Sequence, residues 1–189
     1  VMILEPIIAG SSYPMSFSSF PGRGSLKGQR AIRRWIGSGK GIRNFAQADI
    51  RHFYSHIQYK IVRKKLERRV KDNFFLHLID VCMTYFPKEM PLGFYLSQWL
   101  ANFMLQELDY DIKCKLKIAH HVRYMDNYTL ADDNKKKLHQ ALLYIRQVLG
   151  KMRLRMKSDW QVLNIPRKMG RKRGAACQPW AGCFTGQKC

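Results

Sequence analysis

Two carboxylates, Asp49 and Asp126, are the residues of this sequence best placed for metal chemistry. Asp49 follows an apolar strand-like segment, and Asp126 lies between two short apolar runs with Asn127 directly after it. Carboxylates at adjacent strand ends can share divalent cations, and two cations about 3.5–4 Å apart can clamp the attacking and leaving oxygens of a phosphoryl displacement. Asp and Asn are also favoured in tight hairpins. The spacing alone therefore leaves an ordinary turn and a metal site both open.

The charge of the chain favours a phosphate-rich partner. Among 189 residues, 34 are Lys or Arg and 13 are Asp or Glu, a formal net charge of +21. Each phosphate that a basic side chain neutralises releases condensed counterions, so nucleic acid is the expected partner. A membrane surface is the alternative, but the basic residues are spread over several segments instead of one amphipathic helix. No run of 18 apolar residues occurs, so we expect no membrane-spanning helix and no membrane partner.

The cysteines and the first residues predict a cytoplasmic protein. Cys82 and Cys114 lie in apolar or helical contexts and are expected to be buried free thiols, which fits a reducing compartment. Residues 1–9 are apolar but lack a basic leader, so they make a poor signal peptide.

Hydrophobic periodicity predicts an α+β fold. The clearest helix spans residues 96–115, where apolar residues recur at intervals of three and four. Residues 10–30 have loop composition, and residues 31–36 form a short helix or strand. Further helices are expected at 58–70, 74–85 and 135–152, and strands at 45–53, 122–125, 128–131 and 160–165. This order predicts an antiparallel sheet packed on helices.

Three segments, taken in order, carry a family resemblance. Residues 48–57 read ADIRHFYSHI, residues 91–109 read PLGFYLSQWLANFMLQELD, and residues 124–127 read YMDN. They resemble the strand with the first catalytic Asp, the Ser-Gln helix of the nucleotide pocket and the Tyr-X-Asp-Asp hairpin of reverse transcriptases. The resemblance covers roughly residues 1–165.

Two further segments make the resemblance strongest to bacterial retron, diversity-generating and phage-defence reverse transcriptases. These are Pro-Gly-Arg-Gly at 21–24 and the Trp-Gln-Val strand near 159–162. The resemblance therefore implies a bacterial, phage or mobile-element origin.

The resemblance also implies the catalytic and metal-binding residues. Asp49, Asp126 and Asn127 would bind two Mg²⁺ ions, for which Mn²⁺ can substitute, together with the backbone carbonyl of Ile50. Lys157 would be the catalytic cation near the leaving pyrophosphate. Asn127 stands where the family usually has a second acid. An amide offers a carbonyl oxygen to a hard cation but brings no charge.

A second set of residues is implied to bind substrates. Tyr54 would pack under the incoming sugar and select deoxynucleotides, Gln98 would contact the nucleotide or templating base, and Ser97 and Gly93 would shape the approach. A basic, glycine-containing segment would bind nucleic-acid phosphates through Arg23, Lys27, Arg30, Arg33 and Arg34.

The resemblance implies an RNA-directed DNA polymerase that uses an RNA template, a DNA or RNA primer and deoxynucleoside triphosphates. The expected organisation is a fingers remnant with a basic Gly-rich loop (1–44), a palm (45–165) and an irregular basic, Cys-containing tail (166–189), hence incomplete fingers and no thumb. Two alternatives stay open: a catalytically inactive nucleic-acid-binding remnant, and another palm-type nucleotidyltransferase. Tyr54 argues against use of ribonucleotides.

Overall fold

The structure is a computed structural model that describes residues 3–37, 42–85, 90–91 and 93–165. The predicted tail at 166–189 lies outside the described residues. The helices are α1 (Leu4–Gly10), α2 (Ser25–Gly37), α3 (Phe53–His56), α4 (Tyr59–Arg69), α5 (Asn73–Thr84), α6 (Tyr95–Tyr110), the π-helical turn η1 (Asp111–Lys115) and α7 (Lys135–Lys151). The strands are β1 (Asn44–Arg51), β2 (His120–Tyr124), β3 (Asn127–Asp132), β4 (Arg155–Met156) and β5 (Gln161–Asn164).

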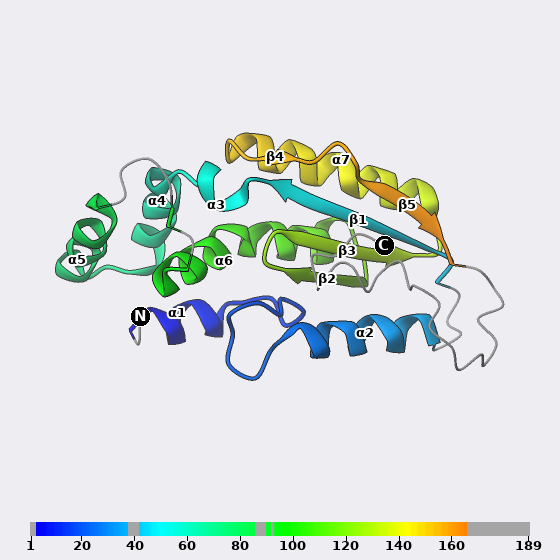
Figure 1. The fold of residues 1–189 in the computed structure, drawn as a ribbon, viewed down its shortest axis with the longest axis horizontal. Helices are drawn as coiled ribbons and strands as arrows, with labels where there is room; N and C mark the ends of the chain where they lie inside the picture. The colour runs from blue at the N-terminus through cyan, green and yellow to red at the C-terminus, as the bar shows by residue number, and fades with distance from the viewer. Residues whose placement is uncertain (1–2, 38–41, 86–89, 92, 166–189) are drawn as a thin grey trace.

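An antiparallel sheet forms the centre of the fold, with β1 as its inner strand (Figure 1). One edge of β1 pairs with β3 along six residues, and β3 continues through a hairpin to β2. The other edge of β1 pairs with β5 near its start and with β4 at its end. Strand β1 therefore ends between the hairpin and β4.

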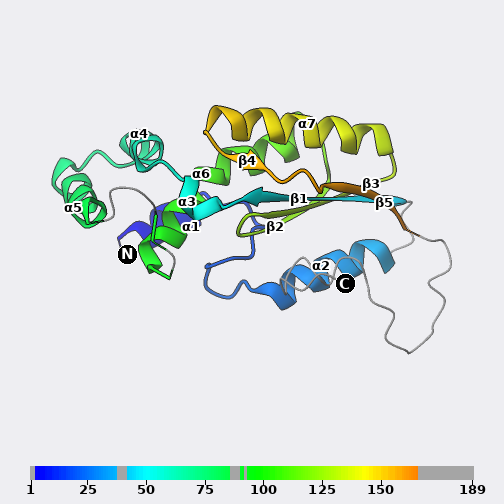
Figure 2. The same ribbon diagram turned by 45° about the horizontal axis from the view of Figure 1, so that its top comes forward.

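The two faces of the sheet have different coverings (Figure 2). Ala46, Ala48 and Ile50 of β1 belong to the main core, which α6 and α7 also build. Side chains alternate along a strand, so the residues between them face the opposite side. On that side α2 packs through Ile32 against Val122 of β2. Asp49 therefore points away from the main core.

The main core explains why α6 and α7 form where they do. Twelve of the sixteen residues of α6 are buried, with Trp99 and Met104 fully enclosed. Helix α7 buries Leu138, Ala141, Leu142, Ile145 and Leu149 on one face, which is the 3–4 spacing of an amphipathic helix. Its first turn is capped by the Asn134 side chain, which accepts a hydrogen bond from the backbone N–H of Lys137.

The predicted α+β class with an antiparallel sheet on helices is confirmed, and most predicted elements lie within a few residues of their observed positions. Three local predictions were wrong. Helix α2 begins at Ser25, inside the predicted loop of residues 10–30. The predicted helix at 96–115 changes at Asp111 into a π-helical turn. Cys114 is exposed and Cys82 half-buried, although both are free thiols, so the predicted burial fails.

A buried arginine joins α6 to the hairpin. Arg123 of β2 is fully buried, and its Nε and Nη2 atoms donate to the carboxylate of Asp109 on α6 at 2.8–3.0 Å. Its Nη1 atom donates to Oδ1 of Asn102 at 2.8 Å and to the carbonyl oxygen of Met125 at 2.9 Å. Asn102 in turn donates to the carbonyl oxygen of Ser18 at 3.2 Å. One guanidinium thus fixes the hairpin tip, α6 and the loop before α2.

This network predicts an unequal response to single and double substitution. Arg123→Met should lower the free energy of unfolding by roughly 3–5 kcal/mol, because it leaves the Asp109 charge buried and unpaired. Arg123→Met combined with Asp109→Leu removes both charges and should recover much of that loss. Urea denaturation of wild type, both single variants and the double variant measures it. A double variant whose loss equals the sum of the single losses would contradict the coupling between Arg123 and Asp109.

Candidate active site

The tip of the β2–β3 hairpin brings Asp126 to the end of β1. Met125, just before it, has a positive φ of 53°, which lets the chain reverse within two residues. In the strand register Asp49 lies directly opposite Asn127. The backbone N–H of Ile50 donates to the carbonyl oxygen of Asp126 at 3.3 Å. The hairpin tip therefore brings Asp126 and Asn127 next to Asp49, which is far from them in the sequence.

The two carboxylates are close enough to influence each other. Burial raises the pKa of Asp126, and the nearby Asp49 carboxylate raises it further. The Oδ1 atom of Asp49 is buried without a hydrogen-bond partner among the described residues. A buried carboxylate oxygen without a donor is costly unless a cation satisfies it.

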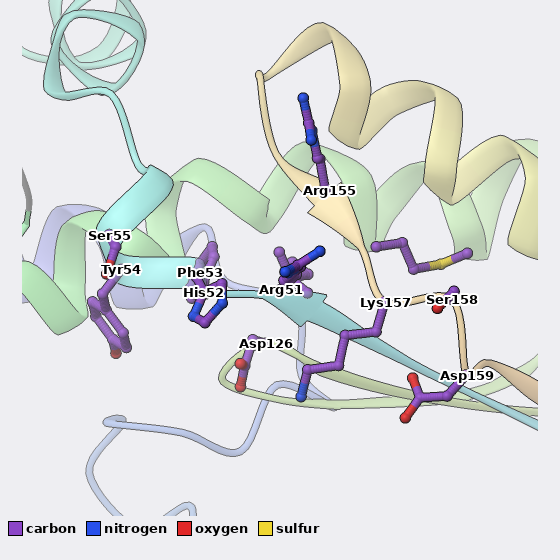
Figure 3. Close-up of a pocket in the computed structure, with 12 residues that line it drawn as sticks. Arg51, His52, Phe53, Tyr54, Ser55, Asp126, Arg155, Lys157, Ser158 and Asp159 are labelled. Atoms are coloured by element: carbon purple, nitrogen blue, oxygen red, sulfur yellow. The ribbon is translucent and has the colours of Figure 1, made fainter.

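Lys157 supplies the cation of this site in the structure. Its Nζ atom lies 2.7 Å from Oδ2 of Asp49, and its backbone N–H donates to the carbonyl oxygen of Asp49 at 2.8 Å. The hydrogen bond to Asp49 raises the pKa of Lys157. Figure 3 shows Lys157 extending toward the hairpin tip that carries Asp126. The predicted cation is therefore part of the acid cluster itself.

The donor set suits a hard divalent cation. Asp49 and Asp126 offer carboxylate oxygens, of which Oδ1 of Asp49 lacks a partner among the described residues. The amide nitrogen of Asn127 donates to Oδ1 of Asp126 at 3.4 Å, which leaves the amide oxygen for a metal. No group of three or more His, Cys, Asp or Glu residues gathers in the described part of the chain, so a metal here would rely on two acids.

A cleft of about 660 Å³ opens beside the two acids. Residues 50–55 and 155–159 form its walls with Asp126 (Figure 3). Tyr54 of α3 is half-buried there, and burial together with the Asp126 charge raises its pKa to about 12. The phenol is thus neutral at physiological pH and acts as a rigid wall. Its predicted role under the incoming sugar stays a prediction.

The predicted nucleotide contacts on α6 have unequal support. The Oε1 atom of Gln98 accepts a hydrogen bond from the Ser19 hydroxyl at 2.8 Å, so the loop before α2 orients this side chain. Gly93 lies before α6 with a φ of +81°, a conformation that favours glycine. Ser97 is fully buried in α6, so the core encloses its hydroxyl group. Its predicted part in shaping the approach to the nucleotide stays a prediction.

The residues predicted to bind nucleic acid differ in their exposure and in their contacts. Lys27, Arg30, Arg33 and Arg34 are exposed along α2. Arg23 instead donates to the carbonyl oxygens of Tyr13 at 2.9 Å and Ser16 at 3.3 Å and lies over the Phe20 ring. Arg23 therefore holds the loop together through its Nη1 atom, and its role as a phosphate ligand stays a prediction.

Sequence reasoning missed several residues around the site. Arg51 and Arg155 line the cleft beside Lys157. The sequence of β1 is long enough to show which of its side chains share a face. Strand β4 is only two residues long, so its sequence shows no such pattern. Arg123 carried a usable signal, since a charged residue inside a short apolar strand needs a buried partner. Asp109, on the apolar side of the long helix, was that partner.

The sequence matches one family of known proteins. The family model described as reverse transcriptase (RNA-dependent DNA polymerase) matches residues 4–160, and the chain belongs to this family. No curated protein matches the sequence.

Among solved structures, telomerase from Candida albicans with the TWJ fragment of telomeric RNA is 13% identical, with a TM-score of 0.64 over 89% of this chain and 34% of that chain. Apo telomerase from Candida Tropicalis is 12% identical, with a TM-score of 0.65 over 89% of this chain and 36% of that chain. At this identity the likeness shows the fold alone, and the chain spans about a third of the length of these structures. Within the described residues, no helix is both long and apolar enough to cross a membrane.

The donor set predicts how the hairpin responds to a second acid. Asn127→Asp should tighten Mn²⁺ binding by at least about tenfold, because it adds a charge next to Asp49 and Asp126. Asp126→Asn should weaken it by a similar factor. Electron paramagnetic resonance of free Mn²⁺ during titration measures both.

A matched control adds the same charge at the other end of the sheet. Asn164 is exposed on β5, opposite Asn44 at the start of β1. Asn164→Asp should leave Mn²⁺ affinity nearly unchanged. An equal gain from Asn164→Asp and Asn127→Asp would mean that the metal responds to overall charge and not to this site.

Proposed function

We propose that the chain provides the palm active site of an RNA-directed DNA polymerase that transfers deoxynucleotides to a primer. The observation that supports it best is the meeting of Asp49 and Asp126 at the mouth of an open cleft walled by Tyr54. Family membership supports the same class of reaction.

Each residue has a defined part in this proposal. Asp49, Asp126 and the amide oxygen of Asn127 would hold Mg²⁺ or Mn²⁺, with the Ile50 carbonyl as a further ligand. Bound divalent ions activate the primer hydroxyl and stabilise the charge that develops on the transferred phosphoryl group. Tyr54 excludes a 2′-hydroxyl by its bulk, and its position in the cleft fixes the depth to which a sugar can enter.

Lys157 has two partners in turn under this proposal. In the structure its ammonium group neutralises Asp49 at 2.7 Å. The flexible Lys157 side chain would turn from Asp49 toward the negative charge of the leaving pyrophosphate. Its Nζ atom would donate a proton to an oxygen of that group, as in general acid catalysis.

The nucleic-acid partners are proposed from charge and from the neighbouring structures. The exposed Lys27, Arg30, Arg33 and Arg34 of α2 lie on the face of the sheet that carries the acids. An RNA template paired to a primer fits this basic face, and the Candida albicans structure contains a fragment of telomeric RNA. We assign residues 1–44 to a fingers portion and 45–165 to the palm.

The alternative is a nucleic-acid-binding protein that does not catalyse. One observation favours it: Asn127 removes one acid and Lys157 neutralises another, so the cluster of Asp49, Asp126 and Lys157 carries a net charge of only about −1. A weaker field for divalent ions would slow the reaction without affecting binding through α2.

Primer extension distinguishes the two functions. Wild type, Asp49→Ala and Asn127→Asp are compared on a DNA-primed RNA template with Mg²⁺ and then with Mn²⁺. The polymerase proposal expects extension by wild type that Asp49→Ala lowers by at least about a hundredfold, since both metal positions depend on this carboxylate.

Extension that persists in Asp49→Ala would place the chemistry elsewhere. If wild type and Asn127→Asp both fail to extend a primer that they bind, the binding-protein alternative holds for this chain. Tyr54→Ala supplies a specificity control, because it should raise incorporation of ribonucleotides relative to deoxynucleotides without changing RNA affinity.

RNA binding should depend steeply on salt. The double variant Arg30→Gln with Arg34→Gln should reduce the slope of log affinity against log salt by about two, one for each lost phosphate contact. Arg146 and Lys136 are exposed on α7, on the other side of the sheet, and the same double change there is the control. Fluorescence anisotropy with a labelled RNA–DNA duplex measures the slopes. Equal slopes for the two double variants would argue against α2 as the binding face.

A further inference from the structure

Two arginines face each other across strands β1 and β4 beside the acids. Arg51 is directly opposite Arg155 in the strand register. Both are exposed, and both line the cleft of about 660 Å³ that also contains Asp126. Figure 3 shows Arg51 beside β1 and Arg155 extending upward from β4, while Lys157 extends the opposite way, toward the hairpin tip.

This pairing is unfavourable in the protein alone. Like charges directly opposite each other in an antiparallel pair destabilise the sheet. Across the described residues, neither arginine forms an ion pair or a side-chain hydrogen bond. Other cations near acids in this chain are paired, as Lys157 is with Asp49. An anion bound between Arg51 and Arg155 would remove the repulsion.

The strand geometry gives the site two parallel rows. Asp49 and Arg51 are two residues apart on β1, and Lys157, which directly follows β4, is two residues from Arg155, so all four side chains leave the backbone from one face of the sheet. Two residues along a strand span about 6.6 Å. Asp49 and Lys157 form the first row, which holds the proposed reacting centre. Arg51 and Arg155 form the second row, two residues further along β1.

We propose that Arg51 and Arg155 form a polyphosphate-binding site, which holds the outer phosphates of the incoming nucleoside triphosphate and then the released pyrophosphate. The inference rests on the proposed function for the reacting end of the triphosphate. Its α-phosphate would lie at the Asp49 row and its β- and γ-phosphates at the Arg51 row. Guanidinium groups bind phosphate oxygens in a bidentate manner, which suits two arginines closing on one group.

The density of charge favours a polyphosphate over a nucleic-acid backbone. Directly opposed residues in an antiparallel pair have Cα atoms roughly 4.5–5.5 Å apart, so the two side chains leave the sheet side by side and their flexible stems allow both guanidinium groups to reach one polyphosphate. A triphosphate concentrates several negative charges in such a volume, whereas a nucleic-acid strand presents one charge per nucleotide. The exposed row on α2, with Lys27, Arg30 and Arg34 spread along a helix, has the extended form that a backbone needs.

Isothermal titration calorimetry with inorganic tripolyphosphate tests the site on the full chain, with and without Mg²⁺. Arg51→Gln and Arg155→Gln should each weaken binding by about tenfold, and the double variant should weaken it further, because each removes a charge-assisted contact. Control variants that remove the same charge on α7, Arg146→Gln and Lys136→Gln, should change the affinity by less than about twofold. The melting temperature of the arginine variants should equal or exceed that of wild type, since a repulsion is removed.

Three results of these binding measurements would overturn the proposal. Wild type that does not bind tripolyphosphate has no such site. Arginine variants that lose no more affinity than the α7 controls show that binding depends on overall charge. Arginine variants that keep tripolyphosphate affinity but lose affinity for the labelled RNA–DNA duplex show that the pair binds backbone phosphate instead.

The assay separates this inference from the polymerase proposal. Tripolyphosphate binding requires no primer, template or catalysis, so its loss in the arginine variants supports the site even if wild type extends no primer. Conversely, if wild type extends a primer and Arg51→Gln with Arg155→Gln leaves the KM for deoxynucleotides unchanged, the polymerase proposal stands and the phosphate site is wrong.

Discussion

The position of the acid at the hairpin tip depends on one buried guanidinium. Arg123 has no exposed surface and donates hydrogen bonds to Asp109, Asn102 and the carbonyl oxygen of Met125. A charge at this depth is tolerated only when its donors are satisfied, which makes the arrangement close to all-or-none. Since Met125 immediately precedes Asp126, the same contacts that satisfy Arg123 also fix where the acid lies. Because Asn102 reaches the carbonyl oxygen of Ser18, the loop that orients Gln98 through Ser19 belongs to the same unit.

The sheet places the buried Arg123 network on one face and the candidate catalytic residues on the other. Along β1, Ala48 and Ile50 enter the core, whereas Arg51 lines the cleft and Asp49 faces the same side. Along β2, Arg123 faces α6 while Val122 packs against α2. The pleat therefore allows a fully paired, buried charge network on one face and a less completely paired cluster of charges on the other. The first kind of charge fixes the backbone, and the second is the one that the proposals assign to metal and phosphate.

The sequence predicted the fold class, the long helix and the hairpin because each rests on a local period or on a turn. It also predicted that Asp49 and Asp126 belong together, although their meeting is a long-range event, because the ordered motifs of a family supplied what periodicity could not. It could not show what tertiary contacts decide. Residue type alone does not reveal that the core encloses Ser97 or that Arg23 donates to loop carbonyl oxygens. The facing of Arg51 and Arg155 depends on the register of a two-residue strand, for which no local pattern exists.

The effect of an amide at position 127 depends on the charged groups around it. A second acid at the tip would place three carboxylates against one lysine, and the mutual repulsion of the acids would raise their pKa values. With an amide, the tip donates to Asp126 at 3.4 Å, and Lys157 covers Asp49 at 2.7 Å, so each acid has a partner in this structure. Under the proposed function, a metal held by Asp49 would compete with Lys157 for that carboxylate, which would lower its affinity. The Lys157 ammonium would then be near the outer phosphates of a triphosphate, because Lys157 is two residues from Arg155. An amide at position 127 would therefore weaken metal binding, and Arg51, Arg155 and Lys157 would compensate for the missing acid when a polyphosphate and a metal bind together.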